Sequence, residues 1–324
     1  MSNKTPLRYP GGKSRAVKTI LPHIPVNCKE LCSPFLGGGS IELAVAATGT
    51  RVYGYDVFRP IVWFWRAVLE NPEKLADISD SFRQINTYVH KKKIVEAKGL
   101  PKESFVSFRR QIEKELEKPN PKFTYDLAAK VYAVNRSSFS GATLSGGFSE
   151  RASYARFTDS SIDRIKNFSQ SNLSVECLDF KESIKKHPNT FMYLDPPYML
   201  SDKQREKLYG KSGNSHSDFD HEGLFELLKD RKDWVMSYGG EAKKILQMYE
   251  GFDIIDLSGK WAYGMKNITA EEIKQIIKDK RELLENEKLE EEERKKLEKE
   301  IKDMSKMGKS SEILIKPNRK EKNC

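Results

Sequence analysis

Long hydrophobic runs are missing from this sequence of 324 residues. No apolar stretch approaches the roughly 20 residues that a membrane-spanning helix requires. The opening residues, Met1 to Pro6, are mostly polar, unlike the apolar centre of a signal peptide. We therefore expect an intracellular, cytoplasmic protein without a membrane partner.

Cysteine is also scarce. Four residues of this type are spread along the chain: Cys28, Cys32, Cys177 and Cys324. Cys28 and Cys32 do not have the ligand spacing of a zinc site. We expect free thiols and no bound metal.

Acidic residues are outnumbered by basic ones. The chain has 57 Lys and Arg against 47 Asp and Glu, a formal net charge of +10. This charge suits a polyanionic partner, because lysine and arginine release condensed counterions from phosphates. Composition alone leaves nucleic acid as one possible partner among others.

The first sixty residues alternate between helix and strand patterns. They predict a loop at 7–14, a helix at 15–21, a strand at 30–33, a glycine-rich turn at 34–40, a helix at 41–47 and a strand at 52–56 that ends on Asp56. A strand, a glycine turn, a helix and a second strand ending on an acid are typical of the start of a doubly wound α/β domain.

This alternation stops near residue 60 and returns near residue 170. The intervening part holds basic and aromatic helical patterns from Trp63 to Ala133 and polar segments from Asn135 to Gly147. Further elements then follow: strands at 173–177, 190–194, 234–237, 254–257 and 312–316, with helices at 222–228 and 241–248. We predict a Rossmann-like α/β domain of residues 1–60 and 170–324, split by a mainly helical insert at 61–169.

Residues 269–307 are rich in Lys and Glu, with sparse apolar positions. The pattern predicts a charged helical hairpin that turns near Asn286. A solvent-exposed decoration is one interpretation, because charge-laced helices usually face water. A contact with DNA or a protein partner is the other.

The strongest single motif runs from Tyr193 to Tyr198, where an apolar strand meets Asp195, two prolines and an aromatic ring. Prolines cannot donate to a sheet ladder, so the strand ends at Asp195. In open α/β sheets, ligands bind beyond the carboxyl ends of strands. The motif therefore predicts a site, although an isolated Asp-Pro-Pro-Tyr also fits a simple turn or helix cap.

Such a motif suits methylation of an aromatic amine. The amine is a poor nucleophile, because its lone pair is delocalised into the ring. The Asp195 carboxylate and the Pro196 carbonyl can accept its two hydrogens and stabilise the developing positive charge, while Tyr198 can stack on the base. The amine lies on a base-pairing edge, so the base must leave the duplex to reach the pocket.

The motifs occur in a characteristic order: Tyr9 to Lys13, Pro34 to Ser40, Asp56, and Asp195 to Tyr198. In this order they closely resemble those of the Dam-like (D12 class, alpha group) adenine-specific DNA methyltransferases. The resemblance extends through 234–238 and 312–316 and leaves out 269–307. It implies a site-specific enzyme for duplex DNA, S-adenosylmethionine as the methyl donor, no metal, and a target-recognition role for the insert.

The resemblance also implies the site residues. Lys13 would lie near the cofactor carboxylate, Asp56 at the ribose hydroxyls and Asp179 at the cofactor adenine; the position of Asp56 at a strand end supports this independently. Tyr9 stands where many relatives have tryptophan. The remaining implied residues are the catalytic Asp195, Pro196, Pro197 and Tyr198, with Tyr9, Phe35, Gly37, Gly39 and again Asp195 as cofactor contacts.

For DNA recognition, the insert and its flanks supply suitable hydrogen-bond donors: Arg109, Asn135, Arg136, Arg151 and Arg156. Arginine and asparagine read guanine and adenine edges, although each arginine alone also fits a phosphate contact or exposure to solvent. The segment 201–220 is expected to close over the flipped base, or else to be a long surface connection.

Several alternatives remain open at this point. The segment Gly11 to Ser14 ends like a phosphate-binding loop, but the first glycine of that motif falls on Leu7, which argues against a nucleotide triphosphatase. Methylation of the cytosine amino group is a second possibility, although Asp at position 195 favours adenine. A catalytically inactive DNA-binding relative is a third. A cognate restriction endonuclease is a possible partner.

Overall fold

The computed structural model describes most of the chain, namely residues 4–90, 93–198, 219–239, 243–257 and 312–318, with isolated helical positions between 275 and 301. The predicted hairpin at 269–307 and the loop at 201–220 lie largely outside the described residues. Within the described part, no helix has the length and apolar character needed to cross a membrane.

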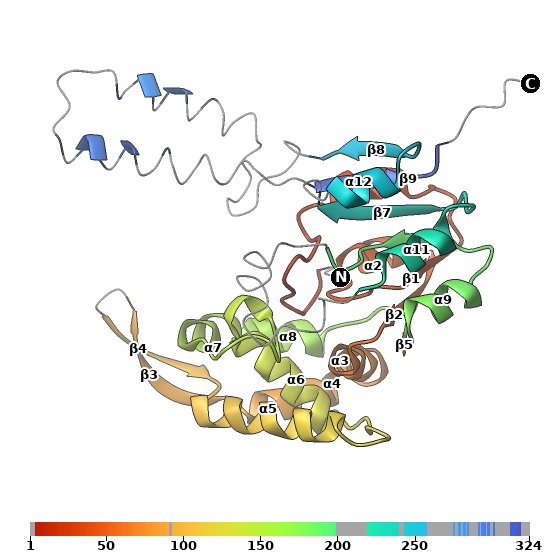
Figure 1. Cartoon of the computed structure of the whole chain (residues 1–324). Coiled ribbons are helices and arrows are strands. Elements are labelled where there is room, and N and C mark those ends of the chain that lie inside the picture. The colour runs from red at the N-terminus through yellow and green to blue at the C-terminus, as the bar shows by residue number, and fades with distance from the viewer. Residues whose placement is uncertain are drawn as a thin grey trace, which may run out of the picture.

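A seven-stranded sheet forms the centre of the molecule, in the order β5-β2-β1-β6-β7-β9-β8 (Figure 1). β9 pairs antiparallel with β7 and β8, and the other neighbouring strands are parallel. All seven strands expected from the sequence are confirmed to within two residues. They are β1 (Glu30–Ser33), β2 (Arg51–Asp56), β5 (Leu173–Cys177), β6 (Phe191–Leu194), β7 (Trp234–Gly239), β8 (Asp253–Asp256) and β9 (Glu312–Lys316).

The chain leaves the middle of the sheet in two directions. From β1 it runs outward through β2 to β5, and from β6 it runs outward through β7. Leu31 pairs with Phe191 where β1 and β6 meet. Such a reversal is the place where open α/β sheets bind ligands. The loops that follow β1 and β6 therefore leave the same edge of the sheet side by side.

Along the central strands, successive side chains alternate between two separate hydrophobic clusters, one on each face of the sheet. Leu31 and Tyr193 belong to the first, whereas Cys32 and Met192 belong to the second. This separation follows from strand geometry, because neighbouring side chains point to opposite faces. Each face is covered by helices: α1 (Val17–Ile20), α2 (Ser40–Ala46) and α3 (Arg59–Glu70) pack in the first cluster, and α9 (Phe180–Lys186), α11 (His221–Leu228) and α12 (Lys243–Met248) in the second.

The chain between β2 and β5 forms a body beside the sheet (Figure 1). It joins the first cluster without a break, since Trp65 of α3 and Tyr132 of α6 are both buried in it. Its elements after α3 are α4 (Pro72–Ser81), β3 (Gln84–His90), β4 (Lys93–Gly99), α5 (Lys102–Leu116), α6 (Tyr125–Ser137), α7 (Glu150–Arg156) and α8 (Asp159–Lys166).

The prediction of helical structure throughout Trp63 to Ala133 is wrong over Gln84–Gly99, where β3 and β4 form an antiparallel hairpin. One face of this hairpin is open to solvent, with Ile85 69% and Ile94 77% exposed. The other face holds Tyr88, which packs on Tyr154 of α7. Polar residues such as Gln84, Asn86 and Thr87 interrupt the apolar ones in this hairpin, so it lacks the apolar run by which the central strands were recognised.

Candidate active site

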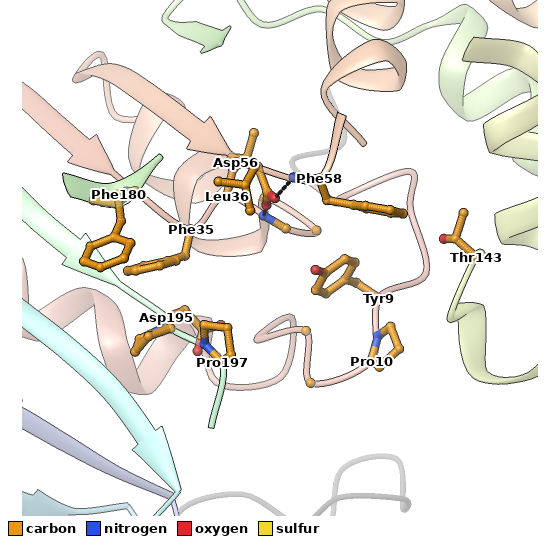
Figure 2. A pocket seen from close by; sticks show the side chains of 18 of the residues that line it. Tyr9, Pro10, Phe35, Leu36, Asp56, Phe58, Thr143, Phe180, Asp195 and Pro197 are labelled. Carbon is orange, nitrogen blue, oxygen red and sulfur yellow. Dashed lines mark hydrogen bonds between the residues drawn. The ribbon is translucent and has the colours of Figure 1, made fainter. Parts of the chain in front are cut away.

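A cavity of about 950 Å³ lies beyond the carboxyl ends of β1, β2 and β6. Its size falls in the range of roughly 300–1,000 Å³ typical of ligand sites. Figure 2 shows Tyr9, Phe35, Asp56 and Asp195 around this hollow. The loop after β1, the acid that ends β2 and the motif after β6 thus meet at the reversal point of the sheet. The whole wall consists of residues 9–13, 34–42, 56–58, 141–145, 179–181, 193, 195–198 and 219–220 together with Arg109 and Glu113.

The glycine turn between β1 and α2 is shaped by two aromatic rings. Gly37 and Gly39 have φ of +45° and +64°, which favour glycine. A Cβ on Gly37 would lie 2.9 Å from the Tyr9 ring, and one on Gly39 would lie 2.7 Å from Trp65. The Trp65 indole also donates to the Gly37 carbonyl at 3.0 Å. These glycines line the cavity, and they also allow the Tyr9 and Trp65 rings to pack closely against the turn.

Asp56 connects this turn to β2. Its Oδ2 accepts from the Gly37 amide at 2.9 Å, and its Oδ1 accepts from the Phe58 amide at 2.8 Å (Figure 2). Burial raises the pKa of Asp56, and the two amide donors oppose this shift. A carboxylate oxygen can accept more than one hydrogen bond, so Asp56 keeps acceptor capacity toward a hydroxyl in the cavity.

Asp179 and Phe35 border another part of the cavity. The Asp179 carboxylate caps α9 by accepting from the Lys181 amide at 2.8 Å. The Phe35 ring stacks on Phe180 with centroids 5.7 Å apart, and it meets the edge of Phe219 at 5.5 Å. The sequence reasoning did not select Phe180 and Phe219, which complete an aromatic wall beside Asp179.

Asp195 lies at the centre of a polar network. Its carboxylate is 2.8 Å from the Lys13 ammonium and accepts from the Ser237 hydroxyl at 3.0 Å. The Tyr198 hydroxyl lies 3.3 Å from Asp195 Oδ1, the oxygen that also accepts from Ser237. Burial raises the pKa of Tyr198, and nearby Asp195 adds to the shift, so this hydroxyl remains a donor. Asp195 is partly exposed toward the cavity.

Lys13 was expected near the carboxylate of the cofactor. In this structure its ammonium is buried and contacts Asp195, while also donating to the Gly11 carbonyl at 2.9 Å. The contact with a cofactor carboxylate stays a prediction. The structure adds a direct link between the N-terminal loop and the motif that follows β6.

Two acids of the site, the buried Glu42 and the partly buried Glu312, were missed by sequence reasoning. Glu42 of α2 accepts from the Ser33 hydroxyl at 2.6 Å, and burial raises its pKa to about 7. Glu312 of β9 lies 3.2 Å from the Tyr198 hydroxyl. A Glu in a short helix and a Glu at the start of a strand both usually face solvent. Neither position therefore carried a signal in the sequence.

Two of the residues predicted to contact DNA are buried in this structure. Asn135 is 0% exposed. Its amide group donates to the carbonyls of Arg8 and Gly141 at 2.7 and 2.9 Å and accepts from the Arg8 amide at 3.0 Å. Arg136 is also buried and donates to the Arg156 and Pro6 carbonyls. Asn135 thus links the loop at 138–145 to the N-terminal segment, and Arg136 links the end of α7 to that segment, because buried polar groups require such partners.

The other three arginines remain at the surface. Arg109 of α5 lines the cavity, with its guanidinium 3.2 Å from Glu113. Arg151 and Arg156 of α7 are exposed. Contacts of these three with DNA stay predictions.

The order of the sheet, the glycine turn after β1 and the Asp-Pro-Pro-Tyr motif after β6 are consistent with a methyltransferase fold. The chain matches the family model of the D12 class N6 adenine-specific DNA methyltransferases over residues 9–265, which is most of its length, and it belongs to that family. The resemblance stated from the motifs is confirmed. Membership implies DNA as the substrate and S-adenosylmethionine as the methyl donor, and it favours adenine over the cytosine alternative.

Proposed function

We propose that this adenine-specific DNA methyltransferase acts at a short recognised sequence in duplex DNA and methylates an adenine that is flipped into the cavity at Asp195. One observation carries the proposal: Asp195 and Tyr198 share a single cavity with the glycine turn and Asp56. A donor site and an acceptor site must adjoin for direct transfer of a methyl group.

The chemistry of the lining suits S-adenosylmethionine. Asp56 offers acceptors to ribose hydroxyls, and the aromatic wall of Phe35 and Phe180 offers a stacking surface to an adenine ring. Asp179 on the same wall offers an acceptor for an exocyclic amine. When bound, the cofactor supplies an electrophilic methyl group on a sulfonium.

The residues of the chain would prepare the adenine amine for attack. Asp195 and the Pro196 carbonyl accept its two hydrogens, which draws the lone pair out of the ring and stabilises the charge that develops on nitrogen. Tyr198 provides the stacking surface, worth roughly 1–3 kcal/mol per base. Lys13 and Ser237 hold the Asp195 carboxylate in one orientation. After transfer the amine has become acidic, and Asp195 is placed to receive its proton.

The body between β2 and β5 would recognise the target sequence. It brings Arg109 to the cavity wall and presents Arg151 and Arg156 to solvent on α7. Arginine is suited to both phosphates and guanine edges. The exposed face of the β3–β4 hairpin extends the same body (Figure 1).

The test is transfer of labelled methyl from S-adenosylmethionine to unmethylated genomic DNA, followed by nucleoside analysis and sequencing of the modified positions. We expect N6-methyladenine at one short recurring word. Methyladenine scattered without a common word would contradict site specificity. Transfer only to unpaired strands would contradict base flipping from a duplex.

A further inference from the structure

Glu312 enters the active site from β9, outside the residues 9–265 that the family model matches. Its side chain is 13% exposed and lies against the Asp-Pro-Pro-Tyr motif. We propose that Glu312 is a positioning residue that holds the Tyr198 hydroxyl and the Lys13 ammonium in place around Asp195. This inference rests on the proposed function and names a further participant in it.

Glu312 and Asp195 share the same two partners. The Tyr198 hydroxyl lies 3.2 Å from Glu312 Oε1 and 3.3 Å from Asp195 Oδ1. The Lys13 ammonium lies 3.7 Å from Glu312 Oε1 and 2.8 Å from Asp195 Oδ1. The Lys13 ammonium pairs with both carboxylates, and the Tyr198 hydroxyl can donate its one proton to either, so the position of each carboxylate depends on the other.

The strand pairing explains how Glu312 reaches the motif. Glu312 is opposite Gly239 in the β7–β9 register. The Tyr198 ring crosses β7 at Gly239, where a Cβ would lie 3.1 Å from the ring, and it stacks on Tyr238 with centroids 4.9 Å apart. The small residue at 239 leaves room for the ring, and the hydroxyl then points to β9.

The second oxygen of Glu312 argues against a purely structural role. Among the described residues, Oε2 is buried without a hydrogen-bond partner. Burial raises the pKa of Glu312, and the Lys13 charge opposes the shift. A buried unpaired oxygen weakens a fold. The unpaired oxygen thus opposes stability, and the contacts of Oε1 with Tyr198 and Lys13 are what the position of Glu312 provides.

A double-mutant cycle tests the inference on the full chain with Glu312→Gln, Tyr198→Phe and the combined variant. Rates of methyl transfer to duplex DNA are measured in single turnovers at saturating S-adenosylmethionine, and thermal melting is recorded for each protein. Asp253→Asn serves as the control, because Asp253 is a half-exposed carboxylate on β8 that pairs with Lys316 at the other end of β9.

We expect Glu312→Gln to slow transfer about tenfold or more with a melting temperature close to that of the wild type, because glutamine keeps the shape and loses the charge. The effect should be clearly smaller in the Tyr198→Phe background, where one of the two links is already missing. Asp253→Asn should transfer methyl at the wild-type rate.

An unchanged rate in Glu312→Gln, or an equal effect in both backgrounds, overturns the inference. A wild-type protein that transfers no methyl to DNA instead refutes the proposed function. In that case the same cycle is measured through the affinity of the four proteins for S-adenosylmethionine, and equal effects of Glu312→Gln in both backgrounds overturn the inference.

Discussion

At the scale of single residues, Asp195 is held by protein donors and also faces the cavity. It accepts hydrogen bonds from Lys13 and Ser237 and is also open to the cavity. In the proposed mechanism, replacing Asp195 with alanine removes an acceptor for the adenine amine, so we expect the single-turnover rate of methyl transfer to fall at least about a hundredfold. The circular dichroism spectrum should change little, and a rate close to that of the wild type would remove Asp195 from the mechanism.

The raised pKa of Glu42 leads to a prediction about how the stability of the fold depends on pH. Its pKa is about 7 in the folded chain because of burial, compared with an ordinary value of 4.5. The folded state thus holds the proton more tightly than the unfolded state does. This contribution to stability is complete below about pH 4.5 and is lost as the pH rises through about 7, a loss on the order of 3 kcal/mol.

Glu42→Gln isolates this contribution, because glutamine does not titrate. Urea unfolding of both proteins at a series of pH values should show the free energy of unfolding of the variant rising relative to the wild type between about pH 4.5 and 7. A difference that stays constant over this range would show that Glu42 is not a buried acid.

At the scale of elements, the glycine turn before α2 depends on the absence of side chains. Gly39→Ala must adopt a φ of +64° and place its Cβ 2.7 Å from Trp65. Gly49 offers a matched comparison, since its φ is +92° and nothing lies within 4 Å of a Cβ there. We expect Gly49→Ala to lower the free energy of unfolding by about 1 kcal/mol and Gly39→Ala by about 3 kcal/mol. Equal losses in chemical denaturation would mean that the contact with Trp65 is unimportant.

The elements also show what could be predicted from the sequence. The central strands were identified because they are short apolar runs that end on Ser33, Asp56 or Asp195. The β3–β4 hairpin was missed because it exposes one face, including Ile85 and Ile94. For the site, the motifs gave Asp56, Asp195 and their neighbours along the chain.

The remaining members of the site depend on contacts between distant segments. Glu312 reaches Tyr198 through strand pairing between β7 and β9, and Asn135 turns inward because the N-terminal segment packs on it. Local patterns contain no information about such pairings. The sequence therefore could not distinguish an exposed polar residue near the predicted DNA-binding loop from a buried one such as Asn135.

At the scale of the whole molecule, the net charge of +10 predicts salt-dependent DNA binding. The logarithm of the affinity should fall linearly with the logarithm of the salt concentration. If Arg151 contacts a phosphate, Arg151→Ala should reduce this slope by about 1. Lys29→Ala is the control, because Lys29 is exposed just before β1, at the edge of the sheet away from the cavity. Equal slopes for wild type and both variants, measured by fluorescence anisotropy, would contradict the prediction.

β9 has a consequence for the timing of activity in the cell. β7 and β8 are joined only through β9 within the described sheet, and the residues of β9 are made after all the other strands. A nascent chain whose residues 312–316 are still inside the ribosome has neither the joined sheet edge nor Glu312 at Tyr198. We expect such chains, and products of premature termination before β9, to transfer no methyl group to DNA. We therefore expect synthesis of residues 312–316 to precede any methylation by this enzyme.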